Sequence, residues 1–169
     1  DKRVGDFVAL EKDLSTDLPY NSYKTSLDRF HWDMDKKTIH IDATQGKAGF
    51  FLATEASQDS LFFLGESADY DLNTGLLEID GVDYIRVADA FIYPKDQHVE
   101  IEEASHMRTL EDSRVLADTA NQNHQIQRAT INILSKREYT ATGYLEFNVE
   151  GHKDQEVFFS EVRVKQDGR

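Results

Sequence analysis

The chain has 169 residues with 19 basic and 32 acidic side chains, which gives a formal net charge of −13, and it contains no cysteine. A chain of this length is most simply one domain with a sizeable hydrophobic core. Its negative charge repels phosphate backbones, so nucleic acid is not expected as a partner. The lack of cysteine excludes disulfides and thiolate metal sites without fixing the redox compartment.

The start of the sequence suggests a part of something longer. The chain opens on Asp1 and lacks the basic-then-apolar beginning of a signal peptide. It also has no apolar run of about 18 residues, the length of a membrane-spanning helix. We therefore expect a processed product or an excised piece of a larger protein.

The first residues follow a helical period. Turn formers and Pro19 in the stretch STDLPYNSY then end that pattern. We predict a short N-terminal helix and an extended segment over residues 1–29, packed on a single all-β domain over residues 30–169. The apolar stripe of the helix has spacings of three, three and four residues: Val4, Phe7, Leu10 and Leu14.

From Phe30 onward the apolar period changes to two. Trp32 and Met34, and then Ile39 and Ile41, alternate with polar residues on either side of DKK, which predicts a hairpin. The alternation returns in LEIDGVDYIRV, HVEIE, ATINIL and YLEFNV, with turn sequences between them. Short strands of this kind are typical of all-β proteins. We predict a twisted β-jellyroll, a sandwich or a short β-solenoid of antiparallel strands.

One stretch, over residues 104–126, fits either a strand or a helix. Met107, Leu110 and Leu116 have spacings that suit a helix. Val115, Thr119 and the following Asn and Gln residues are poor helix formers. We favour strands and keep a helix as the alternative.

The stretch DYDLNTGLLE resembles the start of a calcium loop. Asp69, Asp71 and Asn73 match the first three ligand positions of an EF-hand, but Gly75 and Glu78 lie out of register. An Asn-Thr-Gly sequence between alternating apolar residues is typical of a hairpin turn, with the glycine at positive φ. We favour the hairpin and keep calcium binding as the alternative.

The polar residues give little sign of a metal site or of catalysis. His98, Glu100 and Glu102 share a strand face and could present metal ligands with His106, but a charged outer face is the commoner meaning of such alternation. The sequence has no nucleophile elbow, phosphate-binding glycine loop or kinase motif. We expect no enzyme activity, no metal and no cofactor.

Aromatic residues are the strongest candidates for a binding site. Neighbours on a strand point to opposite faces, so each Phe-Phe pair places one ring on each side of a sheet. The outer ring is either covered by another segment or part of an apolar groove or protein contact. Trp32, with Tyr20, Tyr23 or Tyr84 nearby, could instead stack on a sugar ring. The candidate ligand-binding residues are Phe50, Phe51, Phe62, Phe63, Phe158, Phe159 and Trp32.

The stretch from Ser67 to Phe147 resembles the periplasmic lipopolysaccharide-transport domains of the organic-solvent-tolerance (OstA-like) family. In that family a small residue opens a strand with an aromatic residue, a turn follows, and a Gly-Val step begins the next rung. The resemblance implies a V-shaped jelly roll with an apolar groove for lipid acyl chains and open edges that join end to end. The residues in comparable places are Ala68, Tyr70, Gly75, Gly81, Val82, Ile85, Ala88 and Ala90.

These observations favour a non-enzymatic β module of the cell envelope, periplasmic or extracellular. We expect it to bind an envelope lipid or a protein partner along its sheet, and to self-associate end to end through sheet edges. The alternatives are a carbohydrate-binding module and a structural or assembly repeat of a larger surface protein.

Overall fold

The computed structural model of the protein describes residues 3–8, 15–117, 124–147 and 155–165. Across these residues it is an all-β structure of two antiparallel sheets, consistent with a β-sandwich. The only helical elements in this part of the chain are three 3₁₀ turns: η1 (Ala56–Gln58), η2 (Lys95–Gln97) and η3 (Glu103–Ser105). None of the helices found there has the length and apolar character needed to cross a membrane.

The two sheets differ in size. The six-stranded sheet runs in the order β1 (Val4–Val8), β4 (Arg29–Asp33), β5 (Thr38–Asp42), β8 (Ser67–Asp71), β9 (Leu77–Asp80) and β12 (Val99–Ile101). The ten-stranded sheet runs in the order β2 (Thr16–Leu18), β3 (Tyr23–Thr25), β6 (Gly49–Ala53), β7 (Phe62–Gly65), β10 (Ile85–Val87), β11 (Ala90–Tyr93), β13 (Leu110–Ala117), β14 (His124–Ser135), β15 (Glu138–Phe147) and β16 (Gln155–Lys165).

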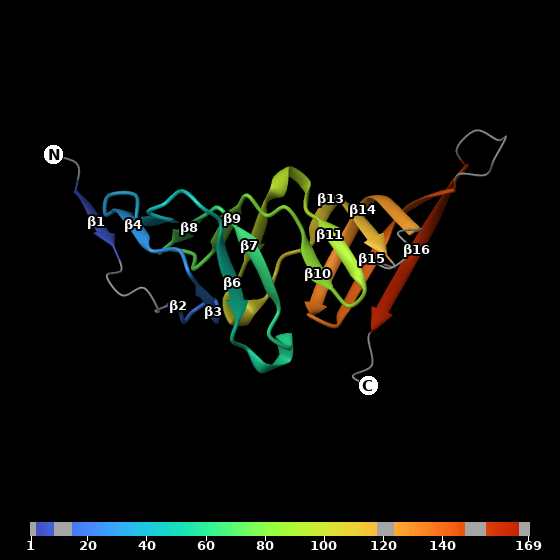
Figure 1. The fold of residues 1–169 in the computed structure, drawn as a ribbon, viewed down its shortest axis with the longest axis horizontal. Coiled ribbons are helices and arrows are strands. Elements are labelled where there is room, and N and C mark those ends of the chain that lie inside the picture. The colour runs from blue at the N-terminus through green and yellow to red at the C-terminus, as the bar shows by residue number, and fades with distance from the viewer. Residues whose placement is uncertain (1–2, 9–14, 118–123, 148–154, 166–169) are drawn as a thin grey trace.

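Hairpins are laid down alternately in the two sheets. The β4–β5 and β8–β9 hairpins belong to the six-stranded sheet, and the β6–β7 and β10–β11 hairpins to the ten-stranded sheet. In both sheets the order across the sheet follows the order along the chain. The molecule is therefore elongated, with β1 near one end and β16 near the other (Figure 1).

One hydrophobic core joins the facing sides of the two sheets. Ile41 and Ile79 of the six-stranded sheet and Phe51, Phe63 and Ile92 of the ten-stranded sheet belong to the same buried cluster. In β5 and β9 the alternate residues face outward and are polar, as the two-residue period predicts. The predicted β4–β5 hairpin is confirmed, with the DKK sequence in its turn.

The predicted N-terminal helix is wrong where the structure describes it. Val4–Val8 forms strand β1, which pairs with β4 from Val4 opposite Asp33 to Val8 opposite Arg29. Pairing with β4 satisfies the backbone groups along one side of β1, while Val4 and Phe7 stay 46% and 54% exposed. The predicted apolar stripe has only four residues, which is too few to distinguish a helix from a strand. Leu10 and Leu14 lie outside the described residues.

The ambiguous stretch is mostly extended. After the η3 turn, Met107 makes a single bridge to Ile101, and β13 follows. The preference for strands is confirmed over Leu110–Ala117 and from His124 onward, while Thr119 and its neighbours lie outside the described residues.

Candidate functional site

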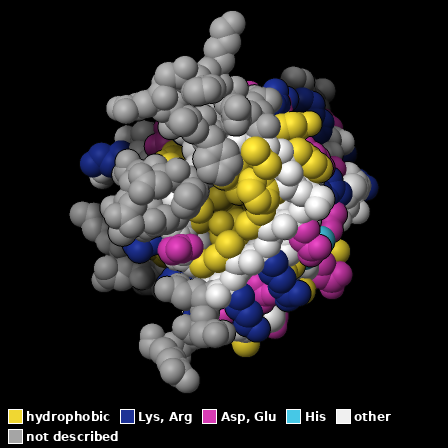
Figure 2. Space-filling model, turned by 90° about the vertical axis from the view of Figure 1, so that its right-hand side faces the viewer, with side chains coloured by type: hydrophobic (Ala, Val, Ile, Leu, Met, Phe, Trp, Pro, Cys, Tyr) yellow, Lys and Arg dark blue, Asp and Glu magenta, His cyan; other side chains and the backbone are white. Residues whose placement is uncertain are grey.

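An apolar cavity of about 220 Å³ lies on the inner face of the C-terminal strands. All its lining residues come from β13 to β16, so among the described residues the six-stranded sheet adds nothing to its wall. Hydrophobic side chains gather at this end of the molecule in Figure 2. The lining residues are Ala117, Ile126, Tyr139, Leu145, Phe159, Val162 and Val164.

The position of this cavity follows from the unequal sheets. The six-stranded sheet ends at β12, whereas the ten-stranded sheet continues past β11 through four more strands. Phe159, Val162 and Val164 remain only partly buried, although they pack against the core cluster. The alternating pattern of β16 thus supplies an apolar face that no strand of the six-stranded sheet covers in the described part of the chain.

Tyr139 is the one lining residue that carries a polar side-chain group, and its ring contributes to the apolar wall. Its hydroxyl is buried and has no hydrogen-bond partner among the described residues. Burial, with a smaller contribution from the charge of Asp89, raises the pKa of Tyr139 to about 12. The group is therefore a neutral hydrogen-bond donor at physiological pH.

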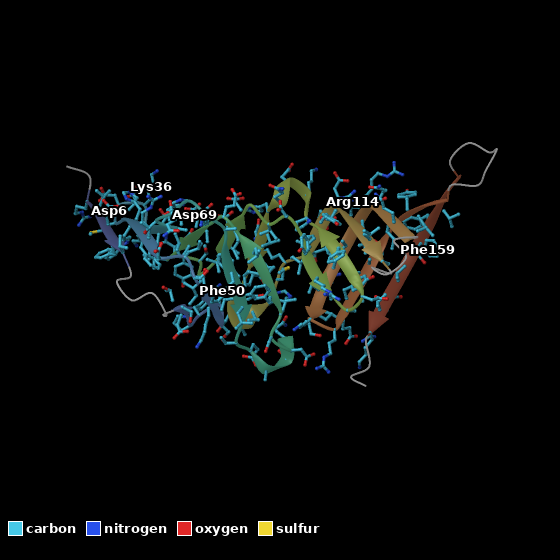
Figure 3. The ribbon with its side chains drawn as sticks, viewed as in Figure 1. Asp6, Lys36, Phe50, Asp69, Arg114 and Phe159 are labelled. Atoms are coloured by element: carbon cyan, nitrogen blue, oxygen red, sulfur yellow. The ribbon has the colours of Figure 1, made fainter. Side chains whose placement is uncertain are left out.

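Each Phe-Phe pair spans its sheet as predicted. Phe51 and Phe63 are buried and stack at 5.6 Å between ring centroids, whereas Phe50 and Phe62 stack at 6.1 Å on the outer face. Figure 3 shows Phe50 and Phe159 in different halves of the molecule. The pairs therefore do not form one groove.

Only the third pair meets the apolar cavity. Phe159 lines it, while Phe158 is 58% exposed on the opposite face, beside Tyr144 at 5.2 Å. Trp32 is half-buried in β4 and lies directly opposite Ile39 of β5. Tyr23 is buried in the core of the other sheet, so these rings do not form a shared exposed platform.

A second cleft, of about 370 Å³, lies on the outer face of the ten-stranded sheet. Phe62 and Tyr84 are 46% and 48% exposed in it, and Tyr84 meets the edge of Phe91 at 5.1 Å. Arg86 lies over Phe91, with Glu66 and Asp83 also in the lining. Sequence analysis named Phe62 and Tyr84 as separate candidates but did not bring them together with Phe91, because the pairing of these segments is not visible in the sequence.

The DYDLNTGLLE stretch is the predicted hairpin between β8 and β9. The Asp71 carboxylate accepts the backbone N–H of Asn73 at 2.7 Å, and this bond holds the pKa of Asp71 below its usual value. Gly75 has φ +73°, as predicted for the turn. Asp69 is directed instead to His40, at 2.9 Å, so the first two calcium-loop carboxylates have other partners.

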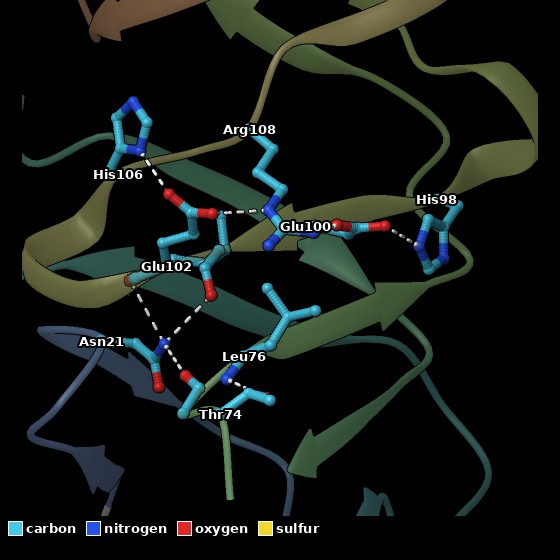
Figure 4. A network of polar contacts seen from close by, with 10 residues as sticks. Asn21, Thr74, Leu76, His98, Glu100, Glu102, His106 and Arg108 are labelled. Atoms are coloured by element: carbon cyan, nitrogen blue, oxygen red, sulfur yellow. Dashed lines mark hydrogen bonds and ion pairs between the residues drawn. The ribbon is translucent and has the colours of Figure 1, made fainter.

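The polar residues suggested as metal ligands separate into two groups (Figure 4). Glu102 accepts a 2.6 Å hydrogen bond from Arg108 and lies 2.9 Å from His106, and these bonds hold its pKa below the usual value. His98 lies 3.7 Å from Glu100. Arg108 binds both Glu100 and Glu102 and so lies between the pair of His98 with Glu100 and the pair of His106 with Glu102.

Glu78 completes the group of His98 and Glu100. Sequence analysis considered Glu78 only in the calcium-loop comparison and did not place it beside these two residues. It lies directly opposite Glu100 in the register of β9 and β12. One ligand atom from each of the three residues lies within 4.8 Å of the others. The signal was the alternation LEID, but cross-strand register is needed to place Glu78 beside Glu100.

No family model, curated protein or solved structure matches the chain in comparisons with known proteins. The functional argument therefore depends on the geometry of the sites.

Proposed function

We propose that the protein is a non-enzymatic β module of the cell envelope or cell exterior that binds an apolar ligand in the cavity beneath β14 to β16. The observation that carries this proposal is a wall made of aliphatic and aromatic side chains. Burial of apolar ligand surface in such a cavity is favourable by roughly 25 cal/mol per Å².

The size of the cavity favours a narrow ligand. Its volume of about 220 Å³ is below the roughly 300–1,000 Å³ of sites that enclose drug-sized molecules. A single acyl chain, inserted by its end, suits this volume better than a fused ring system. The resemblance of Ser67–Phe147 to lipopolysaccharide-transport domains supports the same ligand class and an envelope location.

The test compares two neighbouring residues on opposite faces of β16. Phe159→Asp places a carboxylate in the cavity wall, whereas Phe158→Asp places the same charge on the outer face of the same strand. We expect Phe159→Asp to weaken binding of a fluorescent polyene fatty acid by about tenfold or more, because burial of an unpaired charge is costly. Phe158→Asp should retain the wild-type affinity.

Circular dichroism and thermal melting of both variants check that the fold is kept. Wild-type protein that does not bind the fatty acid, and that retains no envelope lipid in native mass spectrometry, would contradict the proposal. Equal affinities of two folded variants would place the ligand elsewhere.

A carbohydrate-binding module is the second candidate, and the outer aromatic cleft is the observation that favours it. Exposed Phe62 and Tyr84, with Arg86 and Asp83 beside them, combine stacking surfaces with hydrogen-bonding groups. In this case Tyr84→Ala should abolish retention on a polysaccharide affinity gel, while Phe159→Asp should leave it unchanged. Wild-type protein that is not retained on the gel, or equal retention of the wild type and Tyr84→Ala, would contradict this second candidate.

A further inference from the structure

A row of titratable residues crosses the outer face of the six-stranded sheet. One residue of each strand takes part, and each lies opposite the next in the strand register. Its histidines each lie close to a carboxylate of the same row: His31 beside Asp6, and His40 beside Asp69. The row is Asp6, His31, His40, Asp69, Glu78 and Glu100.

At the end of the row formed by β8, β9 and β12, the titratable residues are all acidic. Asp69, Glu78 and Glu100 are consecutive carboxylates across three strands, and like charges directly opposite each other destabilise a sheet. Asp69 has His40 as a partner, and Glu100 has Arg108. Glu78 is half-buried and has no hydrogen bond or ion pair among the described residues.

The imidazole of His98 is oriented toward this position. Its Nδ1 lies 2.7 Å from an Asp80 carboxylate oxygen, which favours the tautomer with the proton on Nδ1. In that tautomer Nε2 carries the lone pair, and it lies 3.7 Å from Glu100 Oε1. A carboxylate that holds the far nitrogen of a metal-bound histidine is the usual arrangement behind such ligands.

Arg108 leaves one oxygen of Glu100 available. The guanidinium binds Glu100 Oε2 at 2.5 Å, so Oε1 remains directed to the side of His98. One ring nitrogen of His98 and one carboxylate oxygen each of Glu78 and Glu100 lie within 4.8 Å of one another. Zinc bonds of about 2.0–2.2 Å need only a modest approach of the three side chains.

We propose that Glu78, His98 and Glu100 form a binding site for a divalent transition-metal ion, with Zn²⁺ as the best-fitting ion. The donor set of one imidazole and two carboxylates suits zinc, which also binds such sites more tightly than manganese or iron(II). Both acidic residues lie on neighbouring strands, so the ion would link the edge strand β12 to β9. Asp80 acts as a positioning residue for His98.

The surroundings leave room for a further ligand. His98 and Glu100 also line a groove of about 500 Å³, together with Arg108 and Lys95. With three ligands from the protein, the fourth position of a tetrahedral ion faces water or a small anion. The metal site is independent of the proposed acyl-chain cavity, which is lined by other residues.

Isothermal titration of the protein with zinc chloride tests the site. We expect submillimolar binding that Glu78→Gln and His98→Asn each weaken by at least about tenfold, since even loss of a supporting residue such as Asp80 typically costs 10–100-fold. His40→Asn is the matched control because His40 also lies between two carboxylates, Asp69 at 2.9 Å and Asp42 at 3.8 Å, on the same sheet. It should leave this binding unchanged.

Thermal melting supplies a second measurement, which separates loss of the site from loss of the fold. Without metal, Glu78→Gln should melt at a higher temperature than the wild type, because it relieves repulsion from Glu100 and Asp69. Added zinc should raise the melting temperature of the wild type but not that of Glu78→Gln. Wild-type protein without submillimolar zinc binding, or equal zinc affinity in wild type and Glu78→Gln, overturns the proposal.

Discussion

Two features of the structure require glycine at position 75: the positive φ of the turn and the close approach of the Tyr20 ring. The φ of +73° at Gly75 disfavours any Cβ, and a Cβ there would lie 2.3 Å from the Tyr20 ring. Gly46 also has a positive φ, but its surroundings are open. We expect Gly46→Ala to cost about 1–2 kcal/mol of unfolding free energy, from backbone strain alone. Gly75→Ala should cost more, because Tyr20 must also move. Urea denaturation of both variants measures the difference, and equal losses would show that the ring contact is unimportant.

Asp42 gives a pH-dependent contribution to stability. Paired hydrogen bonds from the Arg29 guanidinium outweigh the opposing effect of burial and hold the pKa of Asp42 below its usual 3.8. A depressed folded-state pKa stabilises the fold above the unfolded-state pKa, and this contribution is lost as the pH falls through the lower folded-state value. Asp42→Asn should therefore be less stable than the wild type at pH 7, with the gap closing below about pH 4.

Denaturant unfolding across pH 2–7 checks this expectation for Asp42. Asp17→Asn makes the same change in net charge at an exposed pair with Lys24, where the nitrogen–oxygen distance is 3.6 Å, and it should have a much smaller effect. An Asp42→Asn deficit that persists unchanged at pH 2 would mean that the loss comes from packing and not from the charge.

At the level of the strand, the Phe62-Phe63 pair of β7 places one ring in the core and the other on the surface. Phe63 is 2% exposed and stacks on Phe51, whereas Phe62 is 46% exposed. Phe63→Ala should lose about 3–5 kcal/mol, the usual cost of removing a buried phenyl group. Phe62→Ala should lose less than about 1 kcal/mol. Chemical denaturation of the two variants measures both values, and comparable losses would indicate that the outer ring is covered in the folded protein.

The strands also show what the sequence could and could not predict. The two-residue period located β4, β5, β9 and β12 because alternation is a local property of the backbone. It could not show that Glu78 lies opposite Glu100, since register depends on how distant segments pack. For the same reason, the sequence could not separate Phe159 from the six other residues predicted as ligand contacts. Phe159 lines the cavity because the ten-stranded sheet extends beyond the six-stranded sheet, and this difference is not visible in the sequence.

On the scale of the whole molecule, strand order along one axis predicts a gradient of local stability. Central strands such as β7 and β10 have a neighbour on each side and buried inner faces, whereas β1 and β16 pair with one strand only among the residues that the structure describes. Regions with fewer buried apolar contacts open at lower free energy than the core. We therefore expect amide hydrogen exchange to be slowest in β7 and β10 and fastest in β1 and β16.

The same measurement connects this gradient to the proposed function. An acyl chain in the cavity would add apolar contacts to Phe159, Val162 and Val164, all of which are partly buried without it. Saturating fatty acid should then slow amide exchange in β16, and in its partner β15, while exchange in β1 stays unchanged. Phe159→Asp serves as the control and should show no such protection. Uniform slowing in both edge strands would indicate a general effect of the fatty acid on the molecule, and unchanged exchange in β16 would contradict binding at this end.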